Sequence, residues 1–109
     1  MDYPSILDKV HENFRSFDCV KIIPGSIPST LNEVTSDKIA FLHLDLNAAK
    51  PERAALEILW PRLVPNAIVV LDDYGWPLHH EQKASYDEFF NEKAANILRL
   101  PTNQAVVIK

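Results

Sequence analysis

Hydrophobic residues along the chain fall alternately into short continuous runs and into segments with helical spacing. Residues 39–46 and 67–71 are near-continuous apolar runs, typical of strands buried on both faces of a parallel sheet. Apolar residues recur every three to four positions in residues 51–63 and 80–93, which predicts two helices. Alternating strands and helices indicate an α/β protein.

The first part of the chain predicts one helix, one strand and one turn. Residues 6–14 carry an apolar stripe at helical spacing, and Ser5 stands where it can cap that helix. Residues 20–23 predict a short strand that a Pro-Gly pair ends. Residues 30–34 suggest a short helix or turn.

Two short apolar segments close the chain. Residues 97–100 and 105–108 predict two strands, joined by a hairpin-like turn of polar residues. Together these elements predict a three-layer α/β sandwich, with a mostly parallel sheet and an antiparallel C-terminal hairpin. The length of 109 residues fits a single domain over residues 1–109.

Composition and charge narrow the class of protein. Hydrophobic residues make up 47% and charged residues 24%, as in soluble globular proteins. The formal net charge of -4, with basic residues scattered, disfavours binding to nucleic acid or to a membrane surface. No apolar run approaches the roughly 20 residues of a membrane helix, and no signal pattern opens the chain. A single cysteine, which excludes an internal disulfide, fits a reducing, cytoplasmic setting.

Cysteine and glycine usage excludes some kinds of site. Cys19 is the single cysteine, so no disulfide can form within the chain. We expect Cys19 to be a small buried core residue, with a reactive thiol as the alternative. Gly25 and Gly75 are the two glycines, too few for a glycine-rich phosphate loop.

Acidic side chains follow the two buried runs directly. Asp45 and Asn47 come at the end of the first, and Asp72 and Asp73 come at the end of the second. Ligands of parallel sheets bind outside the carboxyl ends of the strands, so neighbouring strands would bring these groups together. Three carboxylates suit a hard cation such as Mg²⁺, and one could act as a general base. The alternative is that each Asp caps the following helix or turn.

Histidine and tryptophan side chains each have two interpretations. His43 alternates within the first buried run and is either a core histidine or a catalytic or cofactor contact. His79 and His80 begin a helix, where a solvated helix start is favoured over a metal site. Trp60 and Trp76 are expected to pack, although Trp76 could line a pocket.

Several segments, taken in order, resemble the macrocin O-methyltransferase (TylF-like) family. The element Leu-Asp-Asp-Tyr-Gly is the most specific of them. The matching segments are GSIPSTL at residues 25–31, FLHLDLN at 41–47, AALE at 54–57, WPRLVPN at 60–66, AIVVLDDYG at 67–75 and LPTNQAVVIK at 100–109. The chain is similar to the C-terminal part of these class I, S-adenosylmethionine-dependent methyltransferases.

The resemblance implies a metal-assisted methyl transfer from S-adenosylmethionine to a hydroxyl of a sugar or small molecule. It implies that Asp45 is the base or a metal ligand, that Asp72 and Asp73 complete a Mg²⁺ site, and that His43 faces the cofactor. The chain departs from the family at Asn47 and at Ala49, where the family usually has Asp and Tyr. Asn47 can still offer a carbonyl oxygen to a cation.

The family's glycine-rich turn and its first two strands have no counterpart in the sequence. The family's sheet order is 3-2-1-4-5-7-6, so we expect residues 20–23 to move beside residues 39–46 and give the order 3-4-5-7-6. We also expect a homodimer that covers the remaining apolar surface. Two further functions stay open: a catalytically inactive binding or oligomerisation module, and a metal-dependent hydrolase that uses the Asp cluster.

Overall fold

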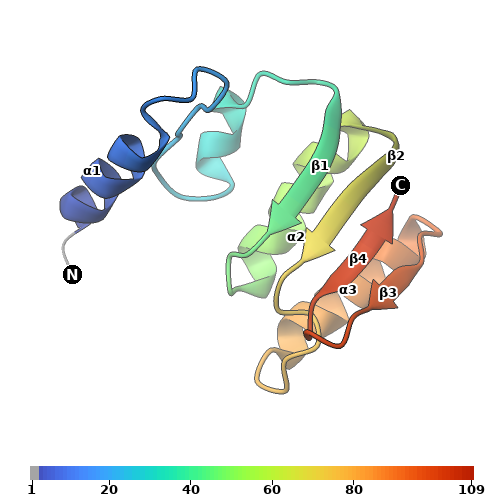
Figure 1. Cartoon of the computed structure of the whole chain (residues 1–109). Helices are drawn as coiled ribbons and strands as arrows, with labels where there is room; N and C mark the ends of the chain where they lie inside the picture. Colours follow the sequence, from blue (N-terminus) through green and yellow to red (C-terminus); the bar gives the residue numbers. More distant parts are fainter. Residues whose placement is uncertain (1–2) are drawn as a thin grey trace.

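A mixed four-stranded sheet forms the centre of the molecule (Figure 1). The computed structural model describes the backbone of residues 3–109 and the side chains from Ser5 onwards. The strand order is β1-β2-β4-β3, in which β1 and β2 are parallel while β4 is antiparallel to both of its neighbours. The strands are β1 (Ile39–Leu44), β2 (Leu63–Leu71), β3 (Ile97–Arg99) and β4 (Ala105–Ile108).

The helices agree closely with the hydrophobic spacing. They are α1 (Tyr3–Phe14), α2 (Ala49–Leu59) and α3 (His80–Glu92), with short 3₁₀ turns η1 (Ser29–Glu33) and η2 (Trp60–Arg62). The second predicted helix ends early because Pro61 lacks the N–H that the helix would need, and the chain tightens into η2. None of the helices described is long and apolar enough to cross a membrane.

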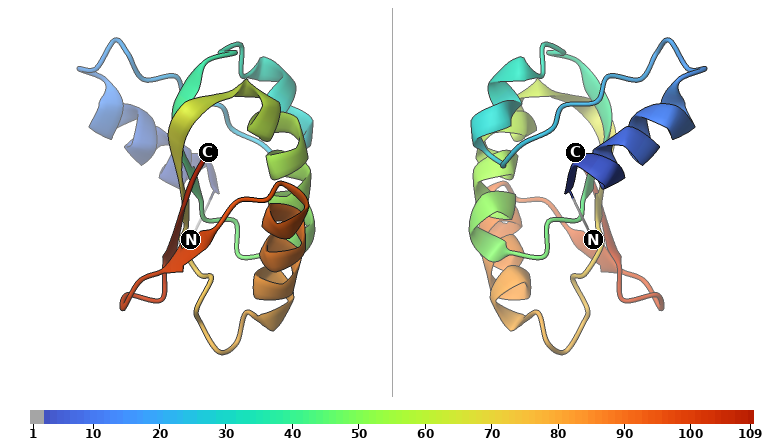
Figure 2. Two further views of the ribbon diagram at one scale, coloured as in Figure 1. Left: turned by 90° about the vertical axis from the view of Figure 1, so that its right-hand side faces the viewer. Right: turned by 90° about the vertical axis from the view of Figure 1, so that its left-hand side faces the viewer.

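The core lies between the sheet and the two helices α2 and α3, which cover the same face (Figure 2). Leu71, Val69 and Val107 point from the sheet into this core and are fully buried. Phe89 and Phe90 of α3 meet them, and the ring of Trp60 packs edge-on against both at 5.8 and 5.7 Å. The expectation that Trp60 is a packing residue is confirmed.

The prediction of three layers is wrong for the part of the chain that the structure describes. α2 and α3 lie on one side of the sheet, and no described helix covers the other side (Figure 2). Alternate strand residues therefore point into solvent, among them Phe41, which is 59% exposed, and Ile108, which is 60% exposed. The sheet is also not mostly parallel, because only the β1–β2 pair is parallel.

The expected strand at residues 20–23 does not form, so the order 3-4-5-7-6 is wrong as well. Residues 20–23 have no partner strand, and β1 is an edge strand of the sheet described. The neighbouring segment is held elsewhere, since Leu31 of η1 is buried in the core and Lys21 Nζ donates to the Glu33 carbonyl at 2.9 Å. Residues 20–23 thus lack the ladder hydrogen bonds that define a strand.

Three smaller expectations also fail. Ser5 lies inside α1 rather than before it, because the helix already begins at Tyr3. Cys19 is exposed and not a core residue, since the whole segment 11–21 packs against little else. Trp76 is 49% exposed in the loop after β2, so it does not pack as Trp60 does.

An irregularity in β2 sets the register at its carboxyl end. Ile39 pairs with Leu63 but Phe41 pairs with Ile68, so β2 bulges between these positions. Asn66 lies in the bulge with a φ of 70°, a left-handed conformation that Asn tolerates better than most residues. After the bulge the pairing is regular, and Leu44 lies opposite Leu71.

Candidate functional site

Three carboxylates meet at the carboxyl ends of β1 and β2. Because Leu44 is level with Leu71, the residues that follow, Asp45 on one strand and Asp72 and Asp73 on the other, leave the sheet at the same edge. One carboxylate oxygen from each lies within 4.8 Å of the others. Within residues 3–109 no other three His, Cys, Asp or Glu side chains converge in this way. The sequence correctly predicted that these side chains meet, while their roles stay predictions.

The electrostatics of the cluster separate its members. Partial desolvation raises the pKa of Asp45, and the negative charges of Asp72 and Asp73 raise it further. Hydrogen bonds lower the pKa of Asp72. The hydrogen bond from Gln104 has the largest effect and the one with His43 a smaller effect, while partial desolvation acts in the opposite direction. The ionised form of Asp72 is thus favoured, while ionisation of Asp45 is disfavoured by the two neighbouring negative charges, a repulsion that a bound cation would offset.

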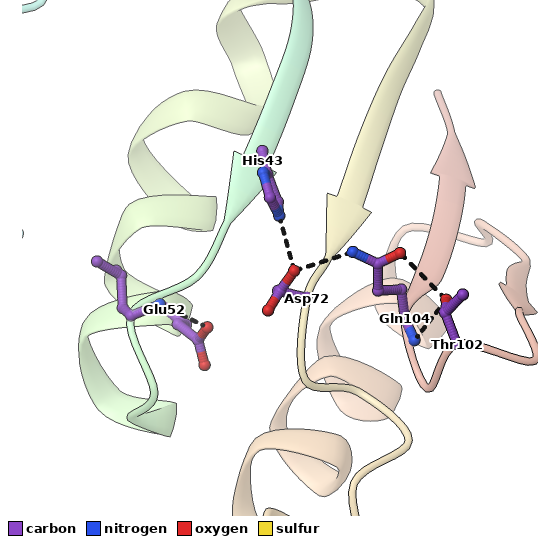
Figure 3. Close-up of polar contacts among 6 residues, drawn as sticks. His43, Glu52, Asp72, Thr102 and Gln104 are labelled. Atoms are coloured by element: carbon purple, nitrogen blue, oxygen red, sulfur yellow. Dashed lines mark hydrogen bonds and ion pairs between the residues drawn. The ribbon is translucent and has the colours of Figure 1, made fainter. Parts of the chain in front are cut away.

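Asp72 is held from both sides (Figure 3). His43 Nε2, from β1, lies 3.1 Å from Asp72 Oδ1, and the side-chain amide of Gln104, just before β4, donates to the same oxygen at 2.9 Å. These two contacts fix the carboxylate group relative to three strands of the sheet. Sequence analysis missed Gln104, because its position opposite Asp72 depends on the register of β4 against β2.

His43 is not a core histidine. Its side chain is 43% exposed, and by strand alternation it lies on the same face as the exposed Phe41 and opposite the buried Leu44. It contacts Asp72, which places it beside the carboxylate cluster. Its assignment to the cofactor side stays a prediction.

A buried carboxylate supports the loop that carries Asp45. Glu52, in the first turn of α2, is 2% exposed and accepts hydrogen bonds from Gln82 Nε2 at 2.6 Å and from the backbone N–H of Leu46 at 3.4 Å. The loop after β1 is therefore tied to both α2 and α3. Helical spacing in the sequence could have indicated that Glu52 is buried, because Glu52 lies on the same helical face as Ala55 and Leu59.

Two buried oxygens in this region have no hydrogen-bond partner in the structure. They are Asp73 Oδ2 and the Tyr86 hydroxyl. Burial raises the pKa of Tyr86, and its proximity to Glu52 adds to the effect, so the hydroxyl stays protonated. An unpartnered buried carboxylate oxygen is unfavourable unless a donor or a cation binds it, so Asp73 Oδ2 favours a ligand at the cluster.

An open cavity of about 460 Å³ lies beside the loop after β1, beginning two residues beyond Asp45. Asn47 and Ala49 line one side, and residues 78–82 line the other. Asn47 has a φ of 56°, which turns the chain sharply two residues after Asp45. His79 contributes to the wall and contacts the Gln82 side chain, while His80 is exposed. Neither histidine belongs to the carboxylate group, so their interpretation as a metal pair gains no support.

Comparison with known proteins identifies the family. The family description "Macrocin-O-methyltransferase (TylF)" matches residues 5–101, which is most of the chain. The chain belongs to the macrocin O-methyltransferase (TylF) family. The resemblance found at FLHLDLN and LDDYG in the sequence is thus confirmed.

Two characterised relatives are similar in sequence. An 8-demethyl-8-(2,3-dimethoxy-α-L-rhamnosyl)-tetracenomycin-C 4'-O-methyltransferase of Streptomyces olivaceus is 35% identical over 73 residues, which are 63% of this chain and 28% of that protein. A mycinamicin III 3''-O-methyltransferase of Micromonospora griseorubida is 28% identical over 90 residues, which are 79% of this chain and 35% of that protein. The chain spans about a third of the length of these relatives.

Solved structures confirm the fold. The O-methyltransferase NovP superposes with a TM-score of 0.79 at 22% identity, covering 94% of this chain and 44% of that protein. CalS11, a TDP-rhamnose 3'-O-methyltransferase solved in its apo form, superposes with a TM-score of 0.74 at 22% identity, covering 97% of this chain and 51% of that protein. The four-stranded mixed sheet and its helices therefore match part of a methyltransferase fold.

Proposed function

We propose that this chain forms the cation-binding and acceptor-binding part of an O-methyltransferase that acts on a sugar hydroxyl. The observation that carries the proposal is the convergence of Asp45, Asp72 and Asp73 within 4.8 Å at the ends of two parallel strands. Membership of the macrocin O-methyltransferase family supports the reaction class. The name of the Streptomyces olivaceus relative, which methylates a rhamnosyl-tetracenomycin, supports a sugar hydroxyl as the acceptor.

The chemistry of the carboxylate cluster fits Mg²⁺. Three carboxylates provide the hard oxygen ligands that this cation prefers, and the unpartnered Asp73 Oδ2 offers a free lone pair. Asp45, Asp72 and Asp73 would hold the ion. When bound, it would supply Lewis-acid chemistry, lowering the pKa of a hydroxyl coordinated to it.

The chain's own residues would prepare the acceptor hydroxyl. Asp45 is exposed at the cluster and its pKa is raised, so its carboxylate is suited to accept the hydroxyl proton. The cavity beside Asn47 has a size in the range of about 300–1,000 Å³ that small-molecule sites occupy. Asn47 offers an amide group in its wall for another hydroxyl of a sugar, while the Gln82 amide is already bonded to Glu52 and in contact with His79.

The described residues do not fit the whole of S-adenosylmethionine. The cavity beside β1 measures about 260 Å³, and among its lining residues only His43 and Asp45 have polar side chains. That lining offers too few partners for the amino, carboxylate and ribose groups of the cofactor, so the described residues alone do not provide its binding site. The same observation favours a second function, a binding or assembly module that works without S-adenosylmethionine.

The cation site is tested by thermal unfolding in Mg²⁺ or Ca²⁺. A ligand at a hundred times its Kd adds about 2.7 kcal/mol to the free energy of unfolding, which raises Tm by several degrees or more. We expect this increase for the unmodified chain and its loss in the double variant Asp72→Asn with Asp73→Asn. The matched control neutralises two exposed carboxylates elsewhere, Asp18→Asn with Asp37→Asn, and should keep the increase. An unchanged increase in the cluster variant would remove the proposed site.

Calorimetric titration with S-adenosylhomocysteine, in the presence of Mg²⁺, distinguishes the two functions. Micromolar binding would support the methyltransferase and contradict the poor fit of the cavity beside β1. Absence of binding at millimolar ligand, with the cation effect intact, would support the module without cofactor.

A further inference from the structure

One face of the sheet is apolar and uncovered. This open face lies opposite α2 and α3 (Figure 2). The register places Phe41, Ile68 and Ile108 side by side across three strands, and Leu98 next to Val106 in the adjacent row. The exposed fractions are 59% for Phe41, 42% for Ile68, 64% for Leu98 and 60% for Ile108. Soluble monomers rarely expose a continuous apolar patch larger than a few hundred Å².

A second apolar surface, at the start of the chain, is also uncovered. We call it the α1 stripe: Ile6 and Phe14 on α1, with Phe17 and Val20 directly after it. These side chains are 39%, 45%, 55% and 39% exposed, in chain order. The rings of Phe14 and Phe17 lie 6.3 Å apart, so the stripe continues past the end of the helix. An amphipathic helix gains most of its stability by burying such a stripe.

The helix does not cover the open face of its own chain. α1 stands beyond β1, on the side of the sheet that α2 and α3 do not cover (Figures 1 and 2). Both surfaces stay in solvent in this arrangement, since Phe14 and Phe41 each remain close to half exposed or more.

We propose that two copies of this chain associate through these surfaces, with α1 of each copy lying on the open face of the other. Each chain has one α1 stripe and one open face. In a two-fold symmetric dimer each stripe covers the open face of the partner, so all four surfaces are buried and no further copies can add.

The area is sufficient for a stable dimer. With aromatic and large aliphatic side chains of this exposure, the two helix-on-sheet contacts would bury on the order of 1,500 Å², against roughly 1,200–2,000 Å² for specific interfaces. The charges are compatible as well. The apolar residues of the open face bear no charge, and the charged pair His43–Asp72 lies at the carboxyl-end edge of that face. By helical spacing Asp8 and Glu12 fall on the side of α1 away from Ile6 and Phe14, while Arg15 and Lys21 flank the stripe beside Phe14 and Phe17. An apolar partner therefore fits better than nucleic acid or an acidic peptide.

The first test is the mass of the purified chain in solution, by size exclusion with light scattering. We expect twice the chain mass of 12.4 kDa. Ile108→Lys on the open face and Phe14→Lys on the α1 stripe should each give monomers. Ile58→Lys is the matched control, because Ile58 is 38% exposed on α2, away from both surfaces, and its variant should stay dimeric. An unmodified chain that is monomeric at about 100 μM, or a dimer that survives either variant, would overturn the proposal.

A mixing experiment identifies which chain the helix covers. Mixing the monomeric Ile108→Lys and Phe14→Lys variants leaves one intact contact, because the first supplies a normal α1 and the second a normal open face. A heterodimer is therefore expected, weaker than the original dimer by tenfold or more. Two folded variants that stay monomeric when mixed would show that α1 does not cross between chains. Leu98→Lys replaces Ile108→Lys if circular dichroism shows that the latter is unfolded. None of these outcomes depends on cation binding, so the dimer and the proposed function fail or stand separately.

Discussion

The side-chain amide of Gln104 donates a hydrogen bond to Asp72 Oδ1 at 2.9 Å, which links the closing hairpin to the carboxylate cluster. The antiparallel register makes this contact possible, because Leu71 pairs with Ala105 and the two neighbouring side chains are level. His43 contacts the same oxygen from β1. The charge of Asp72 therefore depends on residues from three strands.

Gln104→Leu should raise the pKa of Asp72, because the amide is the largest cause of its lowering. A carboxyl whose folded pKa is lowered stabilises the fold above its unfolded value near 3.8, and that contribution is lost as the pH falls through the folded pKa. We expect a loss of about 1 kcal/mol in the free energy of unfolding at neutral pH, shrinking in acid. Urea denaturation across this pH range measures it, and an equal loss at every pH would contradict the assignment.

Asp45→Asn should make the cation-free chain less sensitive to pH. The pKa of Asp45 is raised, so its ionisation lowers stability as the pH rises from 3.8 through the folded pKa. Removing the ionisable group removes that loss, and it also removes a ligand. The variant should therefore melt at a slightly higher temperature than the unmodified chain near pH 7 without cation, and gain less from added Mg²⁺. A variant that melts lower without cation and keeps the full Mg²⁺ effect would contradict both roles.

The pair of Glu52 and Gln82 should behave as a buried unit. Glu52→Leu leaves the amide of Gln82, which is 3% exposed, without its acceptor, and should lower the free energy of unfolding by about 1–3 kcal/mol. Replacing both residues by Leu removes the unpaired group, so the double variant should be more stable than Glu52→Leu alone. A double-mutant cycle from chemical denaturation tests this, and strictly additive losses would show that the two side chains do not interact.

Gly75→Ala should destabilise the loop after β2. The backbone N–H of Gly75 donates to the Asn103 carbonyl at 2.7 Å, and an added Cβ would lie 3.1 Å from that oxygen and 3.0 Å from Arg99 Nε. The hairpin would have to shift, which would lower the free energy of unfolding by about 1–3 kcal/mol. The same shift would move Gln104 away from Asp72. Thermal unfolding should show a lower Tm together with a smaller Mg²⁺ effect. An unchanged Tm would mean that the loop has room that the distances do not indicate.

Sequence patterns predicted the elements that bury their apolar residues within the chain. Residues 105–108 form β4 as predicted, since they alternate between core and open face against β2. The prediction failed at residues 20–23, where the apolar residues are suited to a strand but the sheet offers no neighbour. Periodicity records which side chains can be buried and not whether a partner strand is present.

The carboxylate cluster was predictable for a different reason than its supporting residues. Asp45 and Asp72 follow strands that are parallel neighbours, and this topology alone brings them together. Gln104 and Gln82 reach the site from elements whose register and rotation only the fold determines. Polar residues in turns and on helix surfaces are too common for the sequence to single out these two.

The edge position of β1 has a consequence for motion at the cluster. β1 pairs with β2 only, so along its outer side the backbone amides of residues 39–44 have no sheet partner within the part of the chain described. Hydrogen exchange should therefore be faster in β1 than in β2, which has neighbours on both sides. Local opening of β1 would carry Asp45 away from Asp72 while the hairpin stays closed. A bound cation would then slow hydrogen exchange of the β1 backbone amides. The exchange rate of these amides would therefore report whether the carboxylate cluster holds a cation.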